Sequence, residues 1–212
     1  MEYSRHSMSV VVKICGITSA SDGLTAVEAG ADALGFMFYD RSPRCISVPS
    51  AAAIIRDLPP FVVKVGVFVD ASEDFVTRAI GECGLNLLQF HGAESPAYCR
   101  QFGLMSMKAF RIRDADSLKA LTEYETDAWL LDACVPDQPG GTGTTFPWDL
   151  AIEAKKLGRP IFLAGGLNPA NVGQAIQCVQ PYAVDVSSGV EAAPGRKDRQ
   201  KVRDFIRAAK AS

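Results

Sequence analysis

The chain has 212 residues, enough for one large domain that buries most of its surface, with 48% hydrophobic and 22% charged residues as in ordinary globular proteins. Its formal net charge of -2 argues against nucleic acid as the main partner. No apolar run approaches the ~20 residues that span a bilayer, and the polar first residues lack the apolar segment of a secretory signal. We therefore expect a cytoplasmic protein that binds neither nucleic acid nor membrane.

Short apolar runs alternate with amphipathic stretches from residue 10 to the end, a pattern typical of buried parallel strands separated by helices. The predicted strands are Val10–Cys15, Ala33–Phe38, Val62–Phe68, Leu85–Phe90, Ser106–Phe110, Ala128–Asp132, Ile161–Ala164 and Ala183–Ser187. Helices are predicted over Ser50–Leu58, Ser72–Cys83, Ser95–Phe102, Asp114–Glu123, Trp148–Leu157, Asn168–Val179 and Asp198–Lys210. Ser95 and Asn168, each followed by proline, are expected to begin their helices.

The number of units favours a closed barrel. Eight β/α units in 212 residues average 212/8, or about 26 residues each, close to the smallest workable size for a barrel unit. We therefore predict an α/β fold in which residues 10–212 form a single (β/α)8 TIM barrel and residues 1–9 a flexible extension. An open, doubly wound sheet is the alternative, because periodicity alone does not show closure. The first turn, Cys15-Gly16-Ile17-Thr18, lacks the G-x-G-x-x-G pattern of that alternative.

Two predicted strands end in turns of very small residues. The run from Ile161 to Ala164 is followed by Gly165-Gly166, and the run from Ala183 to Val186 is followed by Ser187-Ser188-Gly189. Such turns let backbone N–H groups approach an anion, and the loops after the last two strands of a barrel commonly bind a substrate phosphate. A phosphorylated small molecule is therefore the expected partner, and these five turn residues are its candidate binding site.

Cys15 stands at the end of the first predicted strand, on the same face as Lys13. A nearby ammonium lowers the pKa of a thiol, so Cys15 is a candidate base, and a buried, inert cysteine is the alternative. Asp185 in the last strand is expected to pair with Lys13, because the first and last strands of a closed barrel are neighbours. The six cysteines contain no C-x-x-C pair, so neither a zinc site nor a disulfide framework is expected.

Asp132 and His91 are two further polar residues at predicted strand ends. Asp132 follows an apolar run, where desolvation would raise its pKa toward the range of a general acid at neutral pH. A capping role for Asp132 in the next turn is the alternative. His91 either contacts substrate or only bonds to neighbouring loops.

A glycine-rich segment follows the sixth predicted strand and reads DQPGGTGTT over residues 137–145. Its composition suits a lid, with Gly141, Thr142 and Gly143 closing over a phosphate or sugar. A plain surface connection explains the same composition equally well.

Eight motifs occur in a distinctive order. They are KICGIT at 13–18, GADALGFMFY at 30–39, VGVFV at 65–69, LQFHG at 88–92, LLD at 130–132, GGTG at 140–143, LAGGLNP at 163–169 and VDVSSGVE at 184–191. In this order the chain resembles phosphoribosylanthranilate isomerase of tryptophan biosynthesis, from Val10 onward. The resemblance implies a (β/α)8 barrel that catalyses an Amadori rearrangement of N-(5-phosphoribosyl)anthranilate with no cofactor and no metal.

The resemblance also implies residue roles. The family's general base falls on Cys15 and its general acid on Asp132, while Arg44 matches the arginine that contacts the anthranilate carboxylate. His91 and Asp185 are further candidates for substrate binding.

Asp40, Cys45 and Thr144 depart from residues common in this family. The first two are expected to alter packing around the anthranilate ring, and the third to weaken lid or phosphate contacts. None of the three replaces the acid or the base.

Two other functions are considered. A related phosphate-binding barrel enzyme, such as an indole-glycerol-phosphate synthase or a ribulose-phosphate epimerase, needs a lysine pair or metal-binding histidines, and the predicted barrel contains one histidine, His91. A phosphate-binding module without catalysis has no need of both Cys15 and Asp132. For the assembly, we expect a monomer or a homodimer.

Overall fold

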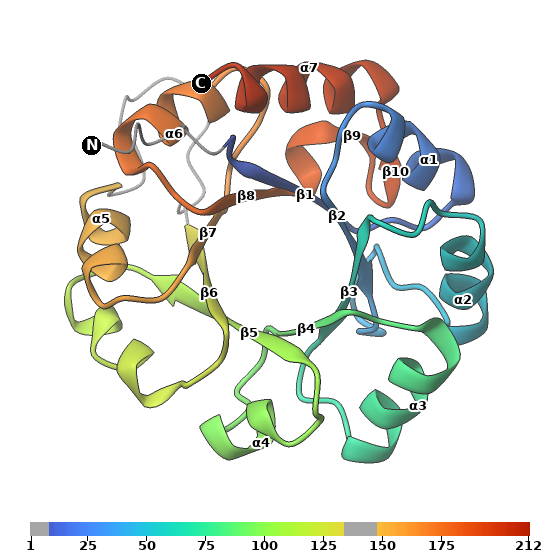
Figure 1. The fold of residues 1–212 in the computed structure, drawn as a ribbon, viewed down its shortest axis with the longest axis horizontal. Helices are drawn as coiled ribbons and strands as arrows, with labels where there is room; N and C mark the ends of the chain where they lie inside the picture. The colour runs from blue at the N-terminus through green and yellow to red at the C-terminus, as the bar shows by residue number, and fades with distance from the viewer. Residues whose placement is uncertain (1–8, 134–147) are drawn as a thin grey trace, which may run out of the picture.

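Eight parallel strands form a closed barrel in the computed structural model, which describes residues 9–133 and 148–212 (Figure 1). The strands are β1 (Val11–Cys15), β2 (Ala33–Met37), β3 (Val63–Phe68), β4 (Leu87–Phe90), β5 (Met105–Ile112), β6 (Ala128–Ala133), β7 (Ile161–Ala164) and β8 (Ala183–Val186). Each strand pairs with the next in chain order, and β8 returns to pair with β1 from Val11↔Ala183 to Ile14↔Val186. This closure confirms the predicted barrel and decides against the open sheet.

Helices surround the barrel on the outside (Figure 1). Within the described ranges they are α1 (Ala20–Glu28), α2 (Val48–Arg56), α3 (Glu73–Cys83), α4 (Pro96–Arg100), α5 (Trp148–Lys156), α6 (Val172–Val179) and α7 (Arg199–Lys210). Serine hydroxyls accept a backbone N–H at the start of four of them, where Ser19, Ser47, Ser72 and Ser95 cap α1 to α4. None of these helices is long and apolar enough to cross a membrane.

The helix predicted over Asp114–Glu123 is wrong, because the segment forms two 3-10 turns, η1 (Asp116–Leu118) and η2 (Leu121–Glu123). The Asp114 carboxylate accepts the backbone N–H of Ser117 at 2.9 Å and its hydroxyl at 2.7 Å, which fixes a local turn in place of a longer helix. Leu118 of η1 packs against the core and Leu121 of η2 is buried in it, so each short turn contributes one apolar side chain.

The predicted start of α6 at Asn168 is also wrong. The Asn168 side chain accepts the N–H of Ala170 at 2.9 Å, and the Asn171 side chain accepts the N–H of Asn168 at 2.8 Å. These bonds form a tight turn, and the helix begins only at Val172. The turn after β7 is therefore longer than predicted.

A short hairpin follows β8 that the apolar pattern does not predict. The chain passes through a 3-10 turn, η3 (Ser188–Val190), into β9 (Glu191–Ala193), which pairs with β10 (Arg196–Lys197). Figure 1 places this hairpin outside β1, next to α1. It brings two charged residues, Glu191 and Lys197, back to the barrel rim.

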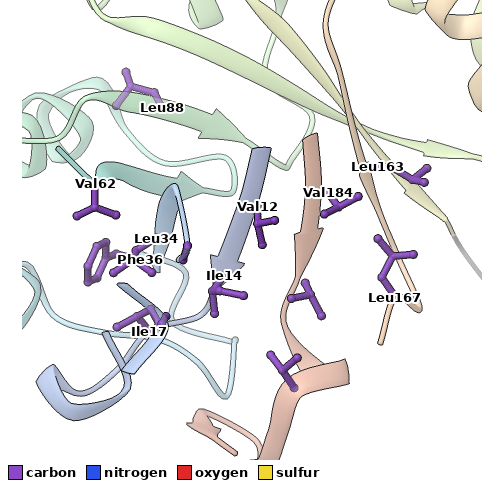
Figure 2. Packing of buried hydrophobic residues seen from close by; sticks show 14 of the residues in the cluster. Val12, Ile14, Ile17, Leu34, Phe36, Val62, Leu88, Leu163, Leu167 and Val184 are labelled. Carbon is purple, nitrogen blue, oxygen red and sulfur yellow. The ribbon is translucent and has the colours of Figure 1, made fainter. Parts of the chain in front are cut away.

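The core has two layers, as expected for strands whose successive side chains alternate between faces. Val12 and Ile14 of β1 belong to the larger layer between strands and helices, with Leu163 of β7 and Val184 of β8 (Figure 2). The smaller layer fills the barrel and contains Cys15, Ala33, Val65, Val67, Leu87, Met107, Ala109, Ala128, Leu130, Phe162, Ala164 and Ala183. The barrel interior is therefore packed, and a ligand can bind only at its rim.

Candidate active site

A cavity of about 450 Å³ opens at the carboxyl ends of the strands. Its lining includes every predicted site residue in the described part of the chain: Cys15, Arg44, His91, Asp132, Gly165, Gly166, Asp185, Ser187, Ser188 and Gly189. The candidate lid residues Gly141, Thr142 and Gly143 lie outside the described residues. Barrel closure thus gathers residues from β1, β4, β6, β7 and β8 around one concave surface.

The turns after β7 and β8 lie directly against each other in the wall of the cavity. A Cβ atom on Gly189 would come within 1.9 Å of the Leu167 carbonyl oxygen, so only glycine fits. Gly165 and Gly166 have φ angles of 82° and 67°, which glycine adopts without strain. The Ser187 hydroxyl is buried and has no hydrogen-bond partner among the described residues. The two turns thus place backbone and small residues in the cavity wall, where an anion can bind.

Lys13 and Asp185 form a buried ion pair beside Cys15. Lys13 Nζ lies 2.9 Å from Asp185 Oδ1, and the two residues face each other across β1 and β8. The pairing predicted from strand adjacency is confirmed. Gly35 of β2 packs against the thiol, since a Cβ atom there would lie 2.7 Å from Cys15 Sγ. Cys15 is therefore closely packed, yet it remains part of the cavity wall.

The surroundings of Cys15 raise the pKa of its thiol. Burial is the largest cause, because the thiolate loses its hydration. Lys13 and Lys197 lower the pKa, but Asp185 opposes them and burial prevails. Lys13 thus lowers the pKa of the thiol as predicted, but burial outweighs this effect, and the pKa of Cys15 lies above its ordinary value.

Asp132 has a partner that the linear sequence does not reveal. His91 Nε2 lies 3.4 Å from Asp132 Oδ2, while His91 Nδ1 lies 2.9 Å from Gln89 Nε2. When the Gln89 amide donates to Nδ1, the neutral ring carries its proton on Nε2, which faces the carboxylate. The Asp132 side chain remains 33% exposed, so it can also reach a ligand.

Arg44 extends from the loop after β2 and is held by Glu191. Its Nε donates to Glu191 Oε1 at 2.8 Å, and its Nη2 donates to Oε2 at 2.7 Å. These bonds are the main cause of a raised pKa for Arg44, which keeps the guanidinium charged. Glu191 also accepts a hydrogen bond from Lys197 Nζ at 3.0 Å.

Three polar residues of this region are absent from the sequence predictions. Gln89 carries a usable signal, because it is a polar residue within the buried strand β4 and lines the cavity. Lys197 carries no comparable signal, and Glu191 ends the motif at 184–191 but has no predicted role, since both belong to the short hairpin after β8. Glu191 bonds to a residue 147 positions earlier, a contact that no local pattern indicates.

Asp40 and Cys45 line a separate depression with Tyr39 and Phe75 and are not part of the cavity wall. Because neither residue lines the cavity, no direct contact supports their expected effect on packing around the anthranilate ring. Thr144 lies outside the described residues.

The sequence profile of the N-(5'-phosphoribosyl)anthranilate (PRA) isomerase family matches residues 12–208. The chain belongs to this family. An N-(5'-phosphoribosyl)anthranilate isomerase of Geobacter sp. (strain M21) is 61% identical over 199 residues, which cover 94% of this chain and 97% of the relative. A PRA isomerase of Trichlorobacter lovleyi is 56% identical over 201 residues, covering 95% and 98%. The predicted resemblance is confirmed, and it decides against the other two phosphate-binding barrel enzymes.

Solved structures of PRA isomerases have the same fold. The Thermotoga maritima enzyme is 44% identical, with a TM-score of 0.89 and coverage of 96% of this chain and 100% of that one. A PRA isomerase in complex with reduced 1-(o-carboxyphenylamino)-1-deoxyribulose 5-phosphate is 42% identical, with a TM-score of 0.86 and coverage of 96% and 100%. Both match nearly the whole barrel.

Proposed function

We propose that this chain isomerises N-(5'-phosphoribosyl)anthranilate to 1-(o-carboxyphenylamino)-1-deoxyribulose 5-phosphate in tryptophan biosynthesis, with Asp132 as general acid and Cys15 as general base. The observation that carries this proposal is the placement of Cys15, Asp132 and both small-residue turns around one cavity. Family membership supplies the substrate.

The substrate is proposed to bind by both of its ends. Its phosphate lies against the turns at Gly165-Gly166 and Ser187-Ser188-Gly189, which line the cavity. Its anthranilate carboxylate binds Arg44, the arginine on the cavity wall. The ribose then extends between Cys15 and Asp132. Binding of a reduced product by a related PRA isomerase supports a ligand of this length.

Asp132 begins the reaction by donating a proton to the ribose ring oxygen. The bond between this oxygen and C1′ breaks, and the nitrogen lone pair forms an iminium with C1′. Loss of the proton leaves Asp132 as a carboxylate. His91 stabilises this carboxylate, because the His91 Nε2–H, 3.4 Å away, can donate to it. The other carboxyl oxygen, Oδ1, is left for the substrate.

Cys15 completes the reaction as the base. Its thiolate removes the C2′ proton, and the electron pair of that C–H bond moves into the iminium to give an enolamine. Protonation at C1′ and loss of the O2′ proton then give the ketone. The iminium is itself the electron sink, so one acid and one base suffice. Its positive charge also favours the thiolate over the thiol, against the burial that raises the pKa of Cys15.

For location and assembly, we propose a cytoplasmic enzyme that is a monomer or a homodimer. One related structure describes monomers generated from a dimeric PRA isomerase of Thermotoga maritima, which supports the dimer as one of the two states. Light scattering of the purified protein distinguishes them by mass.

The activity is tested by the loss of anthranilate fluorescence from freshly prepared N-(5'-phosphoribosyl)anthranilate. We expect the purified protein to accelerate this loss far beyond the rate of spontaneous breakdown. The Cys178→Ser variant, which changes an exposed cysteine on α6, serves as a thiol control and should react like the parent protein. A rate equal to that without protein contradicts the proposed function.

A further inference from the structure

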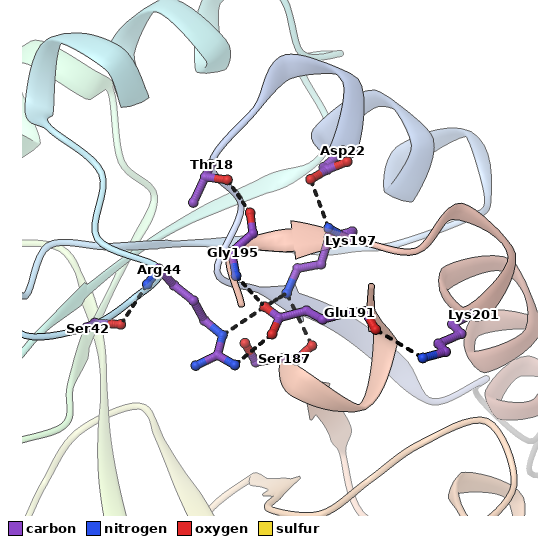
Figure 3. A network of polar contacts seen from close by, with 9 residues as sticks. All are labelled: Thr18, Asp22, Ser42, Arg44, Ser187, Glu191, Gly195, Lys197 and Lys201. Carbon is purple, nitrogen blue, oxygen red and sulfur yellow. Dashed lines mark hydrogen bonds and ion pairs between the residues drawn. The ribbon is translucent and has the colours of Figure 1, made fainter. Parts of the chain in front are cut away.

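A buried charged network connects the two ends of the proposed substrate site (Figure 3). Arg44, Glu191 and Lys197 form its centre, with the Glu191 carboxylate between the two cations. The side chains of Glu191 and Lys197 are 5% and 1% exposed, so water does not replace their mutual contacts. Burial of these charges costs desolvation energy, which their mutual attraction and hydrogen bonds offset only when the geometry is good.

Glu191 binds one particular edge of the Arg44 guanidinium. A guanidinium has two hydrogen-bonding forks, one from Nε with a terminal nitrogen and one from the two terminal nitrogens. Glu191 takes the first fork through Nε and Nη2, and Nη1 makes no hydrogen bond to the described residues. Figure 3 shows that the Nη1 end points away from Glu191. The second fork is therefore available for another carboxylate.

The charges of the network leave one positive charge for that carboxylate. Two cations share a single carboxylate, since Glu191 bonds to both Arg44 and Lys197. The nearby pair of Lys13 with Asp185 is neutral in sum. The contacts hold Glu191 ionised, as its lowered pKa indicates. An incoming carboxylate therefore meets a rigid site with one uncompensated cation.

Lys197 extends the network to the phosphate turn. Its Nζ donates to the backbone carbonyl of Ser187 at 3.2 Å as well as to Glu191. The hairpin that carries both residues is fixed at its base, where the Lys197 N–H donates to Asp22 at 3.0 Å and Lys201 donates to the Glu191 carbonyl at 3.0 Å. Arg44 and the Ser187 turn are thus connected through two side chains.

We propose that Glu191 is the positioning residue that directs the free fork of Arg44 toward the substrate carboxylate, and that Lys197 couples this arrangement to the phosphate turn. This inference rests on the proposed function, because it takes the anthranilate carboxylate as the ligand of Arg44. It predicts that Glu191 contributes to the preference for a carboxylated substrate without touching the reacting atoms.

The test compares two ligands by titration calorimetry. One is reduced 1-(o-carboxyphenylamino)-1-deoxyribulose 5-phosphate, and the other is its phenylamino counterpart without the carboxylate. The parent protein should prefer the carboxylated ligand, and Arg44→Met should abolish that preference. Glu191→Gln should weaken binding of the carboxylated ligand about tenfold or more and change binding of the other ligand little. Lys197→Met should weaken binding of both ligands.

Two further variants serve as a conservative replacement and as a surface control. Glu191→Asp keeps the negative charge on a side chain that is one methylene shorter. This variant should lose part of the preference for the carboxylated ligand, and it provides a test even where Glu191→Gln fails to fold. Arg196→Met removes an exposed charge next to Lys197 on β10 and should bind both ligands like the parent protein.

The outcomes separate this inference from the proposed function. If Glu191→Gln and Glu191→Asp keep the full preference while Arg44→Met loses it, Glu191 does not position Arg44 and the inference is overturned. If Arg44→Met itself keeps the preference, the placement of the anthranilate carboxylate in the proposed function is wrong.

Discussion

At Cys15, burial and charge act in opposite directions on the thiol. Burial raises its pKa, and the cations of Lys13 and Lys197 reduce that increase without cancelling it. A thiol with a pKa above the ordinary value of about 8.5 is less than about 3% ionised at pH 7. The proposed base is therefore mainly a thiol at neutral pH, and the thiolate that it forms is more basic than an ordinary one and removes a C–H proton more readily.

This view predicts the titration of Cys15 alone. The ultraviolet absorbance of the thiolate, taken as the difference between the parent protein and Cys15→Ser, should rise with a midpoint above about 8.5. The midpoint is expected above the ordinary thiol pKa because burial disfavours the charged thiolate. A midpoint well below the ordinary thiol value would show that Lys13 and Lys197 outweigh burial.

At the scale of elements, the two small-residue turns depend on each other. Gly189 leaves no room for a side chain, because the Leu167 carbonyl of the other turn lies where its Cβ would be. The glycine is therefore needed for the contact between the turns after β7 and β8, as well as for access to the backbone. The proposed phosphate site therefore depends on both turns together.

Replacement of this glycine should separate the turns. We expect Gly189→Ala to raise KM for N-(5'-phosphoribosyl)anthranilate strongly and to destabilise the fold by about 1–3 kcal/mol through overpacking. Gly81→Ala is a matched control on α3, where nothing lies within 4 Å of the added methyl group. That control should leave KM unchanged and stabilise the helix by about 0.5–1 kcal/mol. Steady-state kinetics and urea denaturation measure both effects, and an unchanged KM in Gly189→Ala would contradict the shared phosphate site.

The individual elements differ in whether they could be predicted from the sequence. All eight strands were predictable because buried parallel strands are continuous apolar runs, and helix α4 because a capping serine and a proline stand at its start. The turns at Asp114 and Asn168 were not, since side-chain bonds to nearby backbone displaced the helix there. Cys15 and Asp132 were visible as polar residues at strand ends. The Arg44–Glu191 contact was not, because it depends on barrel closure and on an unpredicted hairpin.

For the whole molecule, the contact between β1 and β8 closes the barrel. Lys13 and Asp185 pair across this seam inside the fold, with Lys13 fully buried. Helix α7 covers the same side of the barrel in Figure 1, and Lys210 at its end bonds to Asp32 at 2.6 Å. The ion pair beside the candidate base is therefore also a structural element of the closure.

Removal of one partner should open this seam. Lys13→Met leaves Asp185 buried without a counter-charge, which costs about 3–5 kcal/mol in comparable pairs. The double variant Lys13→Met/Asp185→Leu should recover most of that loss, because both charges are then absent. Urea denaturation gives the free energies of unfolding. Equal stability of Lys13→Met and the parent protein would show that the pair does not hold the seam.

The central claim is that Cys15 is the general base and Asp132 the general acid. Turnover of N-(5'-phosphoribosyl)anthranilate by the variants Cys15→Ser and Asp132→Asn tests it most directly. Each variant removes one proton-transfer group with little change of shape, so each should lose at least about 10²-fold in kcat while remaining folded. The Cys178→Ser control should keep the parent rate. Full turnover by either Cys15→Ser or Asp132→Asn would contradict the assignment of base and acid.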